Sequence, residues 1–354
     1  MISTQISISK GWLHELGDFR FTEAYYWDPT YRAAVDRKID EYLVDTFKDL
    51  PVHNFESNLV QKDFIAPNMV RIGAIQPNLI LGTLLGANLI FPEDADSDID
   101  RSPLKDIAQS VDLPPVELLL QHALVQRLDG QIETALKDTS KITIPPFFWD
   151  TSGRATIHGI FTTAHKLVGE KFFLLMYDNP PLAHAVLAWI SDAYMILLRH
   201  FSQLGGMHTT SVHIGECSGC LISKGDFDIF AKPYIEVFGS RWPLRVHSCG
   251  LSDHLIDSLT HIRNVQSLDV GSNTSIGAIR SRMGKQFLIE VAQPVEILLK
   301  GAEDQASVEW LEKTIEENGD GPLKISCHLE PGYSTEFLAV LTTYSRTHTS
   351  FQAP

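Results

Sequence analysis

The stretch "TSVHIGECSGCLISKGDFDIFAKPYIEVFGSRWPLRVH", residues 210–247, carries the pattern that decides the fold. It begins with a short β-type run at residues 210–214 and ends with another at residues 244–247. Between them, residues 227–238 have the spacing of apolar side chains that is typical of a helix. A strand, a helix and a second strand in this order predict two parallel strands joined by a crossover helix.

The same alternation extends over most of the chain. The other predicted strands are residues 70–75, 88–91, 142–148, 265–270, 287–291 and 323–327. The other predicted helices are residues 115–135, 181–204, 254–262, 294–300 and 308–317. Eight strands at this spacing favour a closed (β/α)8 TIM barrel. An open doubly wound sheet is the weaker alternative because no G-x-G-x-x-G follows the first strand. We expect the barrel over residues 66–354 and a mostly helical N-terminal extension over residues 1–65.

The net charge of the chain limits which classes of partner it can bind. Its 354 residues include 29 Lys and Arg against 44 Asp and Glu, which gives a net charge of −15. A chain this acidic is a poor match for nucleic acid or an anionic membrane surface. It has no run of apolar residues long enough to cross a membrane and no signal-peptide pattern, so we expect a soluble, cytoplasmic protein. The sequence does not decide whether the protein forms a homodimer.

Side chains that can bind a metal follow several of the predicted strands. They are Glu216 and Cys217 after the fourth strand, His247 and Cys249 at the fifth, Asp269 at the sixth and Cys327 at the eighth. The carboxyl ends of barrel strands form one rim, where active sites lie. Imidazole and thiolate are zinc ligands, and three of them leave a coordination position open for catalysis. The sequence therefore predicts a catalytic zinc site at His247, Cys249 and Cys327.

Two simpler interpretations apply to these cysteines. A lone His-x-Cys is often only a buried pair, because cysteine is among the most buried residue types. The Cys217-x-x-Cys220 pair is compatible with a redox pair or half of a zinc site, but no second C-x-x-C accompanies it. We therefore expect Cys217 and Cys220 to be rim thiols without an assigned role, and the sequence leaves open whether one of them joins the metal.

Five passages carry a resemblance to a known family. They are "GIFTTAHKLVG" (159–169), "FFLLMYDNP" (172–180), "LISKGDFDIFAKPY" (221–234), "RVHSCG" (245–250) and "IEVAQPVEILLKG" (289–301). Together they resemble the uroporphyrinogen decarboxylase superfamily, on the branch of zinc-dependent, corrinoid-linked methyltransferases that includes methylcobamide:coenzyme M methyltransferases. The likeness covers about residues 140–345, and the passage at residues 221–234 is the most specific.

This resemblance implies a site and a reaction. The family's H-x-C and later cysteine fall on His247, Cys249 and Cys327 as zinc ligands, and its acidic residue after the fourth strand falls on Glu216. Glu216 would then be an exchangeable fourth ligand, and Asp269 would orient a ligand. The implied cofactors are Zn²⁺ and methylcobalamin as methyl carrier. The implied partners are a small thiol substrate and a corrinoid protein. The A-G-R motif of the decarboxylases is missing near the start of the chain, which counts against porphyrin decarboxylation.

Several functions remain open on the sequence alone. The first is zinc-dependent transfer of a methyl group between a corrinoid and a thiol. A second is a metal-free lyase in which Asp269 and Glu216 act as acid and base. A third is a non-catalytic module that binds a corrinoid or stores metal, and a fourth is a demethylating methyltransferase acting on a methylated donor. The sequence does not name the thiol, which can be coenzyme M, homocysteine or another small thiol.

Overall fold

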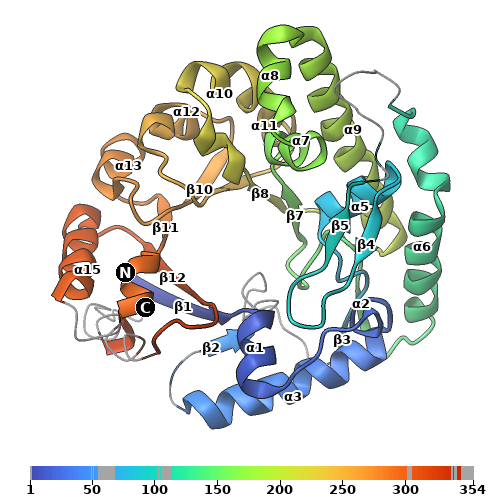
Figure 1. Cartoon of the computed structure of the whole chain (residues 1–354), viewed down its shortest axis with the longest axis horizontal. Coiled ribbons are helices and arrows are strands. Elements are labelled where there is room, and N and C mark those ends of the chain that lie inside the picture. Colours follow the sequence, from blue (N-terminus) through green and yellow to red (C-terminus); the bar gives the residue numbers. More distant parts are fainter. Residues whose placement is uncertain are drawn as a thin grey trace.

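Eight parallel strands form the main sheet of the computed structural model. Its order is β2-β1-β12-β11-β10-β9-β8-β7, and every pair of neighbours is parallel. Figure 1 shows the sheet curled around a central space, with helices on its outside. The structure describes residues 2–48, 50, 52–54, 68–102, 104, 113–300, 305–335, 338 and 341–343.

The strands of the main sheet come from both ends of the chain. They are β1 (Ile2–Ile8), β2 (Val52–Asn54), β7 (Arg154–His158), β8 (Ser211–Gly215), β9 (Leu244–Ser248), β10 (Val265–Val270), β11 (Leu288–Ala292) and β12 (Leu323–Leu329). Two small sheets pair β3 (Met69–Arg71) with β6 (Ile142–Ile144) and β4 (Asn88–Ile90) with β5 (Asp98–Asp100). Strand β1 pairs with β12 along its whole length, from Ile2 opposite Leu323 to Ile8 opposite Leu329.

Helices connect the strands and cover the outer face of the sheet, as Figure 1 shows. The α-helices are α1 (Lys10–Gly17), α2 (Glu23–Trp27), α3 (Pro29–Phe47), α5 (Pro77–Leu84), α6 (Ala123–Leu136), α7 (Ile160–Val168), α8 (Lys171–Asp178), α9 (Pro180–Leu204), α10 (Lys224–Phe230), α11 (Lys232–Gly239), α12 (Ile256–Thr260), α13 (Ile276–Met283), α14 (Val295–Lys300) and α15 (Gln305–Asn318). The 3₁₀ helices are η2 (Val116–Gln121), η3 (Cys217–Leu221) and η4 (Asp253–Leu255).

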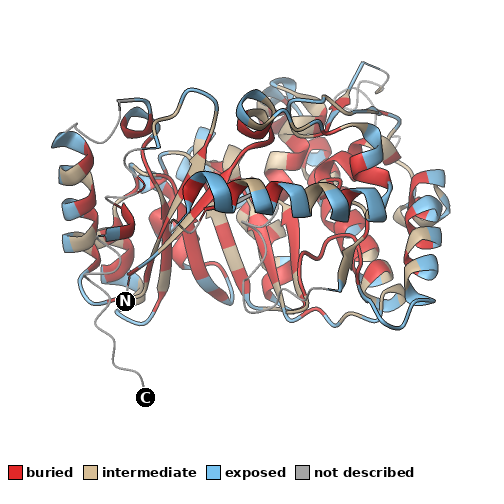
Figure 2. Ribbon diagram, turned by 90° about the horizontal axis from the view of Figure 1, so that it is seen from below, coloured by how far each residue is buried: buried red, intermediate tan, exposed pale blue. Residues whose placement is uncertain are grey.

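The two faces of the sheet differ in chemistry. In β12, Leu323, Ile325, Cys327 and Leu329 are buried, while the residues between them are only partly buried. Because side chains alternate between the faces of a strand, the first set packs outward under the helices and the second points inward. Figure 2 shows buried residues along the strands and a mixture of buried and exposed residues on the covering helices. The apolar core therefore lies outside the sheet, and the inner face is polar.

The predicted strands are confirmed in the C-terminal half, where five of them coincide with β8 to β12. The three earlier ones lie in β3, β4 and β6, which belong to the small sheets. Strands β1, β2 and β7 were missed, so the main sheet begins earlier in the chain than predicted. In β1 the apolar residues are separated by Ser, Thr and Gln, which weakens its pattern.

The closed barrel of the prediction is seen only in part. The edge strands of the main sheet are β2 and β7, and the part of the chain that the structure describes contains no pairing between them. The architecture is therefore an α/β fold with a curled parallel sheet. The predicted helical extension does contain α1, α2 and α3, but it also supplies β1 and β2 to the sheet. Residues 55–65 of that predicted extension lie outside the described residues.

Helix α9 is long and apolar enough to cross a membrane by length and composition alone. Its most apolar window is 67% buried inside the fold. Side chains such as Tyr194, Leu197 and Phe201 are fully buried there. This burial is the pattern of a core helix, in agreement with the expectation that no segment spans a membrane.

Candidate functional site

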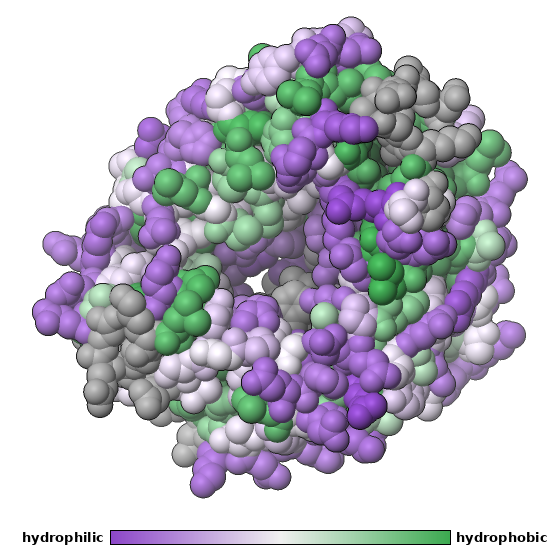
Figure 3. All heavy atoms as spheres, in the orientation of Figure 1, coloured by the Kyte–Doolittle hydropathy of each residue, from purple (hydrophilic) through white to green (hydrophobic). Residues whose placement is uncertain are grey.

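A cavity of about 560 Å³ opens at the centre of the curled sheet. Figure 3 shows the molecule hollowed at this point. Seven strands contribute to its wall: Gln5 of β1, Thr156 and His158 of β7, His213 of β8, Arg245 and His247 of β9, Asp269 of β10, Glu290 of β11, and Ser326 and His328 of β12. This volume is typical of a small-molecule site, and the polar groups that converge on it can orient a ligand.

Strand β9 presents its polar residues to this cavity because of its alternation. Leu244, Val246 and Ser248 are buried on the outer face, whereas Arg245 and His247 are only partly buried. Arg245, His247 and Cys249 all line the cavity. The prediction that the H-x-C spacing puts both side chains on one side is therefore confirmed.

Three side chains that can bind a metal converge here. One ligand atom each from Cys217, His247 and Cys249 lies within 4.8 Å of the other two. Cys217 begins the turn after β8, and the pairing of Gly215 with His247 places that turn beside the end of β9. Cys217 and His247 are partly buried and Cys249 is exposed. Two thiols and an imidazole at this separation have the chemistry of a zinc site with an open position.

Cys327, which the sequence predicted as the third ligand, lies elsewhere. Its side chain is 1% exposed and belongs to the apolar core outside the sheet. The neighbouring residues Ser326 and His328 line the cavity instead. Burial raises the pKa of the Cys327 thiol to about 12, so this thiol stays protonated. The assignment of Cys327 is therefore not supported by the geometry, which places Cys217 beside His247 and Cys249.

Glu216, the predicted fourth ligand, is turned away from the cavity and buried to 1% exposure. Its Oε1 accepts hydrogen bonds from the backbone N–H of Thr162 at 2.7 Å and from the Thr162 hydroxyl at 2.6 Å. Its Oε2 accepts from the backbone N–H of Phe161 at 3.2 Å. The carboxylate thus satisfies free N–H groups in the first turn of α7, which is a structural role.

Asp269 lies where the sequence predicted it, at the cavity, and binds two neighbours. Its Oδ2 accepts from Nδ1 of His247 at 2.7 Å and from Nη2 of Arg245 at 2.8 Å. Burial opposes a charge on His247, but the nearby Asp269 carboxylate raises the pKa of the imidazole to about 10. Burial likewise opposes ionisation of Asp269, yet His247 and Arg245 hold its pKa well below the ordinary value.

Arg245 organises the floor of the cavity, and the sequence analysis gave it no role. Its Nε and Nη2 donate to the two oxygens of Glu290 at 2.6 and 2.7 Å, and its Nη1 donates to Nδ1 of His213 at 2.5 Å. Burial, followed by the charge of Arg245, lowers the pKa of His213 far below its usual range, so this imidazole is neutral. The sequence did contain a signal for this role, because Arg245 is a charged residue two positions before His247 in a mostly apolar strand and therefore lies on the same face.

The thiols differ in acidity. Hydrogen bonds from Cys217 and His247 lower the pKa of Cys249 to about 4. The interaction with Cys249, followed by burial, raises the pKa of Cys217. Cys220 donates to the Cys217 carbonyl oxygen at 3.1 Å and does not belong to the group of three. Cys249 is therefore the more acidic thiol of the pair, and acidity favours the thiolate that acts as nucleophile or metal ligand.

Trp149 lines this cavity and also a small neighbouring one. Asp150 does not line it, because its side chain is fully buried and accepts from the backbone N–H of Ser152 at 2.8 Å.

Comparison with known proteins places the chain in a family. The uroporphyrinogen decarboxylase (URO-D) family model matches residues 79–307, which is more than half of the chain. The structure is similar to a methyltransferase from Methanosarcina mazei, with a TM-score of 0.61 and 17% sequence identity, over 98% of this chain and 93% of that one. It is less similar to a B12-independent methionine synthase from Shewanella sp. W3-18-1, with a TM-score of 0.38 and 12% identity, over 62% of this chain and 66% of that one.

A comparison with curated proteins gave no match. At these identities the likeness to solved structures concerns the fold alone, and the family rests on the match of the family model. The chain therefore belongs to the uroporphyrinogen decarboxylase family.

Proposed function

We propose that this protein is a zinc-dependent methyltransferase that moves a methyl group between a corrinoid and a small thiol. The observation that carries the proposal is the group of Cys217, His247 and Cys249, whose ligand atoms lie within 4.8 Å of one another at the wall of the cavity. In a tetrahedral zinc site, ligands at ordinary bond lengths are separated by about 3.3–3.8 Å. The group thus fits a zinc ion after small side-chain movements.

The supporting residues fit this role as well. Asp269 accepts from Nδ1 of His247, which leaves Nε2 as the nitrogen available to a metal. Arg245 bonds to the same carboxylate and so fixes its orientation. Zinc would supply one function at this place, which is to keep a substrate thiol deprotonated at neutral pH. Cys217, His247 and Cys249 would hold the ion and leave one position for that thiol.

A docking partner would have an apolar surface to bind at this end of the sheet. Leu221, Leu251, Val295 and Leu299 are each about half exposed or more. They follow the carboxyl ends of β8, β9 and β11, and so surround the strand ends that carry the ligands. Figure 3 shows hydrophobic surface beside the central hollow. We propose that a corrinoid protein binds here and presents its methyl group to the cavity.

The metal-free lyase has less support. It needs Asp269 and Glu216 to act together on one substrate, but only Asp269 lines the cavity. Glu216 already accepts from Phe161 and Thr162 at the start of α7. Asp269 is bound to His247 and Arg245. Neither carboxylate is free to exchange a proton with a substrate without giving up these bonds.

The test is spectral and anaerobic. Zinc-loaded protein is mixed with methylcobalamin and, in turn, coenzyme M, homocysteine and other small thiols. We expect methylcobalamin to be converted to cob(I)alamin only when both thiol and zinc are present. Cys217→Ala should abolish the conversion, and Cys327→Ala should keep it. If none of the thiols supports the conversion, a small thiol is not the methyl acceptor and that part of the proposal is wrong. Methylation of cob(I)alamin by a methoxy or methylamine donor would instead support the demethylating alternative.

A further inference from the structure

The wall of the cavity holds two kinds of polar group, and they differ in whether they have partners. The charged groups are paired with one another. Arg245 donates to Glu290 and Asp269, and His247 donates to Asp269. Nδ1 of His328 lies 2.8 Å from the hydroxyl of Ser7, and its Nε2 lies 3.3 Å from Glu330. Glu290 also accepts from Lys324 at 3.1 Å.

The unpaired groups of the wall are neutral. Both amide atoms of Gln293, Nε2 and Oε1, are buried and have no hydrogen-bond partner. The same holds for Nε1 of Trp149 and the hydroxyl of Thr156. The three side chains are 5%, 8% and 6% exposed, and all three line the cavity. Buried polar atoms without a partner are rare in folded proteins, so a group of them around one cavity indicates a ligand that pairs with them.

Gln293 offers one donor and one acceptor from a fixed backbone position. It follows the last residue of β11, and its backbone N–H donates to the carbonyl oxygen of Ser326 at 2.9 Å. The terminal torsion of a glutamine side chain is soft, so the amide can turn toward a bound ligand. A carboxamide pairs with both atoms at once, because it too has one acceptor and N–H donors.

An anionic group fits this wall poorly. A carboxylate or sulfonate only accepts hydrogen bonds, so Oε1 of Gln293 would stay unpaired. Its charge would also meet Asp269, Glu290 and Glu330 on the same wall. Arg245 is the one arginine or lysine among the described residues that line the cavity, and it already bonds to Glu290 and Asp269. A site built to hydrogen-bond one group discriminates strongly against analogues that leave its buried atoms unpaired.

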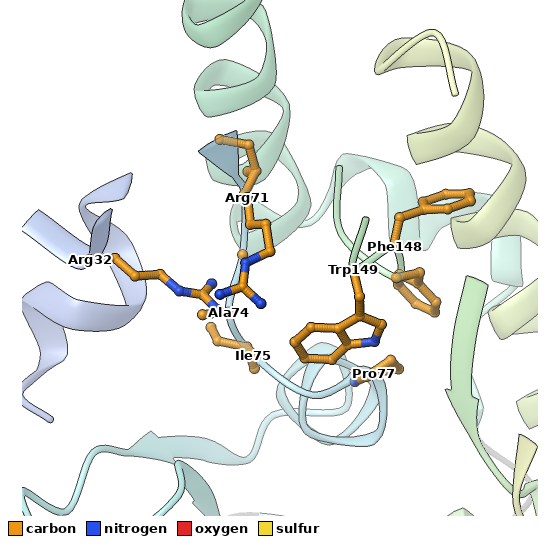
Figure 4. A pocket seen from close by; sticks show the side chains of 10 residues that line it. Arg32, Arg71, Ala74, Ile75, Pro77, Phe148 and Trp149 are labelled. Carbon is orange, nitrogen blue, oxygen red and sulfur yellow. The ribbon is translucent and has the colours of Figure 1, made fainter. Parts of the chain in front are cut away.

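The opposite wall of the cavity also contains buried neutral groups without a partner. Thr156 lies on β7, which is separated from β11 by the three strands β8, β9 and β10. Trp149 precedes that strand, and Figure 4 shows its ring beside the guanidinium of Arg71. The guanidinium carbon lies 6.0 Å from the ring centroid. This contact holds the indole in place. Both walls thus contain side chains whose neutral polar atoms are buried without a partner.

We propose that the thiol acceptor carries an uncharged carboxamide group, and that Gln293 binds this group. That the bound molecule is the methyl acceptor rests on the proposed function, and the inference deepens that function by naming the substrate class. The binding of the amide group itself does not depend on the metal, and the two can therefore be tested apart.

The test measures binding by calorimetry with matched pairs of ligands. Metal-free protein is titrated with 3-(methylthio)propionamide and with 3-(methylthio)propionate. The sulfur of these two compounds carries a methyl group, so it cannot bind a metal as a thiolate. Zinc-loaded protein is titrated with 3-mercaptopropionamide, 3-mercaptopropionate and 2-mercaptoethanesulfonate. We expect the amide to bind about tenfold more tightly than the anion in each set, as one added hydrogen bond to a buried acceptor implies.

Variants separate the role of Gln293 from a general effect on the fold. Gln293→Leu, which keeps the size and removes both polar atoms, should abolish the preference. Gln293→Asn keeps the amide and should retain a preference of the same sign, which guards against a Leu variant that fails to fold. Gln203→Leu, at an exposed glutamine of α9, is the matched control and should behave as the wild type.

The outcomes are distinct. Equal or tighter binding of the anions to wild-type protein would overturn the inference, and so would a preference that survives in Gln293→Leu. If the amide preference holds but no thiol accepts a methyl group, the proposed function fails and the binding inference stands. If methyl transfer occurs with an anionic thiol and not with the amide, the proposed function stands and this inference fails.

Discussion

Nδ1 of His247 lies 2.7 Å from Oδ2 of Asp269, on two adjacent strands whose register sets these residues directly opposite each other. Arg245 donates to the same oxygen from 2.8 Å. The carboxylate therefore fixes both the orientation of the imidazole and the nitrogen that carries its proton. Whatever His247 binds, it binds through Nε2.

Asp269→Asn should weaken zinc binding by about 10–100-fold, the usual cost of losing such a supporting carboxylate. The amide is neutral and no longer holds His247 by a charge-assisted hydrogen bond. Competition with a chromogenic chelator measures the affinity. Asp320→Asn, at an exposed aspartate, is the control and should leave the affinity unchanged. Equal affinities in the two variants would mean that Asp269 does not support a metal ligand.

The cysteine variants decide which thiol is the third ligand. Cys217→Ala should lose zinc, since one of three converging ligand atoms is removed. Cys327→Ala should keep about one zinc per chain and cost about 1–2 kcal/mol of unfolding free energy, because a small buried group is deleted from the core. Metal analysis and urea denaturation give the two quantities. The reverse pattern, with zinc lost only in Cys327→Ala, would restore the ligand set predicted from the sequence.

The pH dependence of alkylation tests the acidity of Cys249. Its pKa is lowered to about 4 by Cys217 and His247, so the reactive thiolate persists as pH falls and disappears only as pH falls through that value. In zinc-free protein, iodoacetamide should modify Cys249 at a nearly constant rate from about pH 8 to about pH 5, whereas an ordinary thiol slows steadily below about pH 8.5. Mass spectrometry follows each cysteine. Cys220, whose pKa is raised by burial, serves as the internal reference. A rate for Cys249 that falls tenfold per pH unit in this range would contradict the assignment.

Gly159→Ala should destabilise the fold without removing the metal. A Cβ atom at Gly159 would overlap the side-chain carboxylate of Glu216 and would displace this group, which satisfies the start of α7. We expect a loss of about 2–3 kcal/mol in urea denaturation, with zinc content unchanged. Gly130→Ala is the matched control. It lies within α6 with nothing inside 4 Å of its added Cβ, so it should gain up to about 1 kcal/mol. Equal stability of the two variants would show that the close approach at Gly159 has no cost.

Alternation within strands explains how much of the site the sequence revealed. It correctly placed His247 and Cys249 on one side of β9, where they line the cavity. The same rule applied to β12 sets Cys327 with Leu323, Ile325 and Leu329, and opposite Ser326 and His328. The signal against Cys327 was therefore present in the chain. The chemistry of the cysteine side chain outweighed it in the prediction.

Other parts of the site were not readable from local patterns. Cys217 reaches His247 because β8 and β9 are neighbours and because the turn after Gly215 runs toward β9, which depends on three-dimensional geometry. Glu216, next in the chain, turns the other way to bond Phe161 and Thr162. Adjacent residues in a turn point in different directions, and the direction depends on backbone angles that the sequence pattern does not encode.

The pairing of β1 with β12 has a consequence for how the chain folds. Residues 2–8 are synthesised long before their partners at 323–329. Until then, one edge of β1 has open hydrogen-bonding groups, and the chain must close a loop of more than three hundred residues to cover them. Pairings of such long sequence separation are slow to form. Completion of the sheet therefore waits for the second strand, and until then the nascent chain carries an exposed strand edge that chaperones or neighbouring chains can bind.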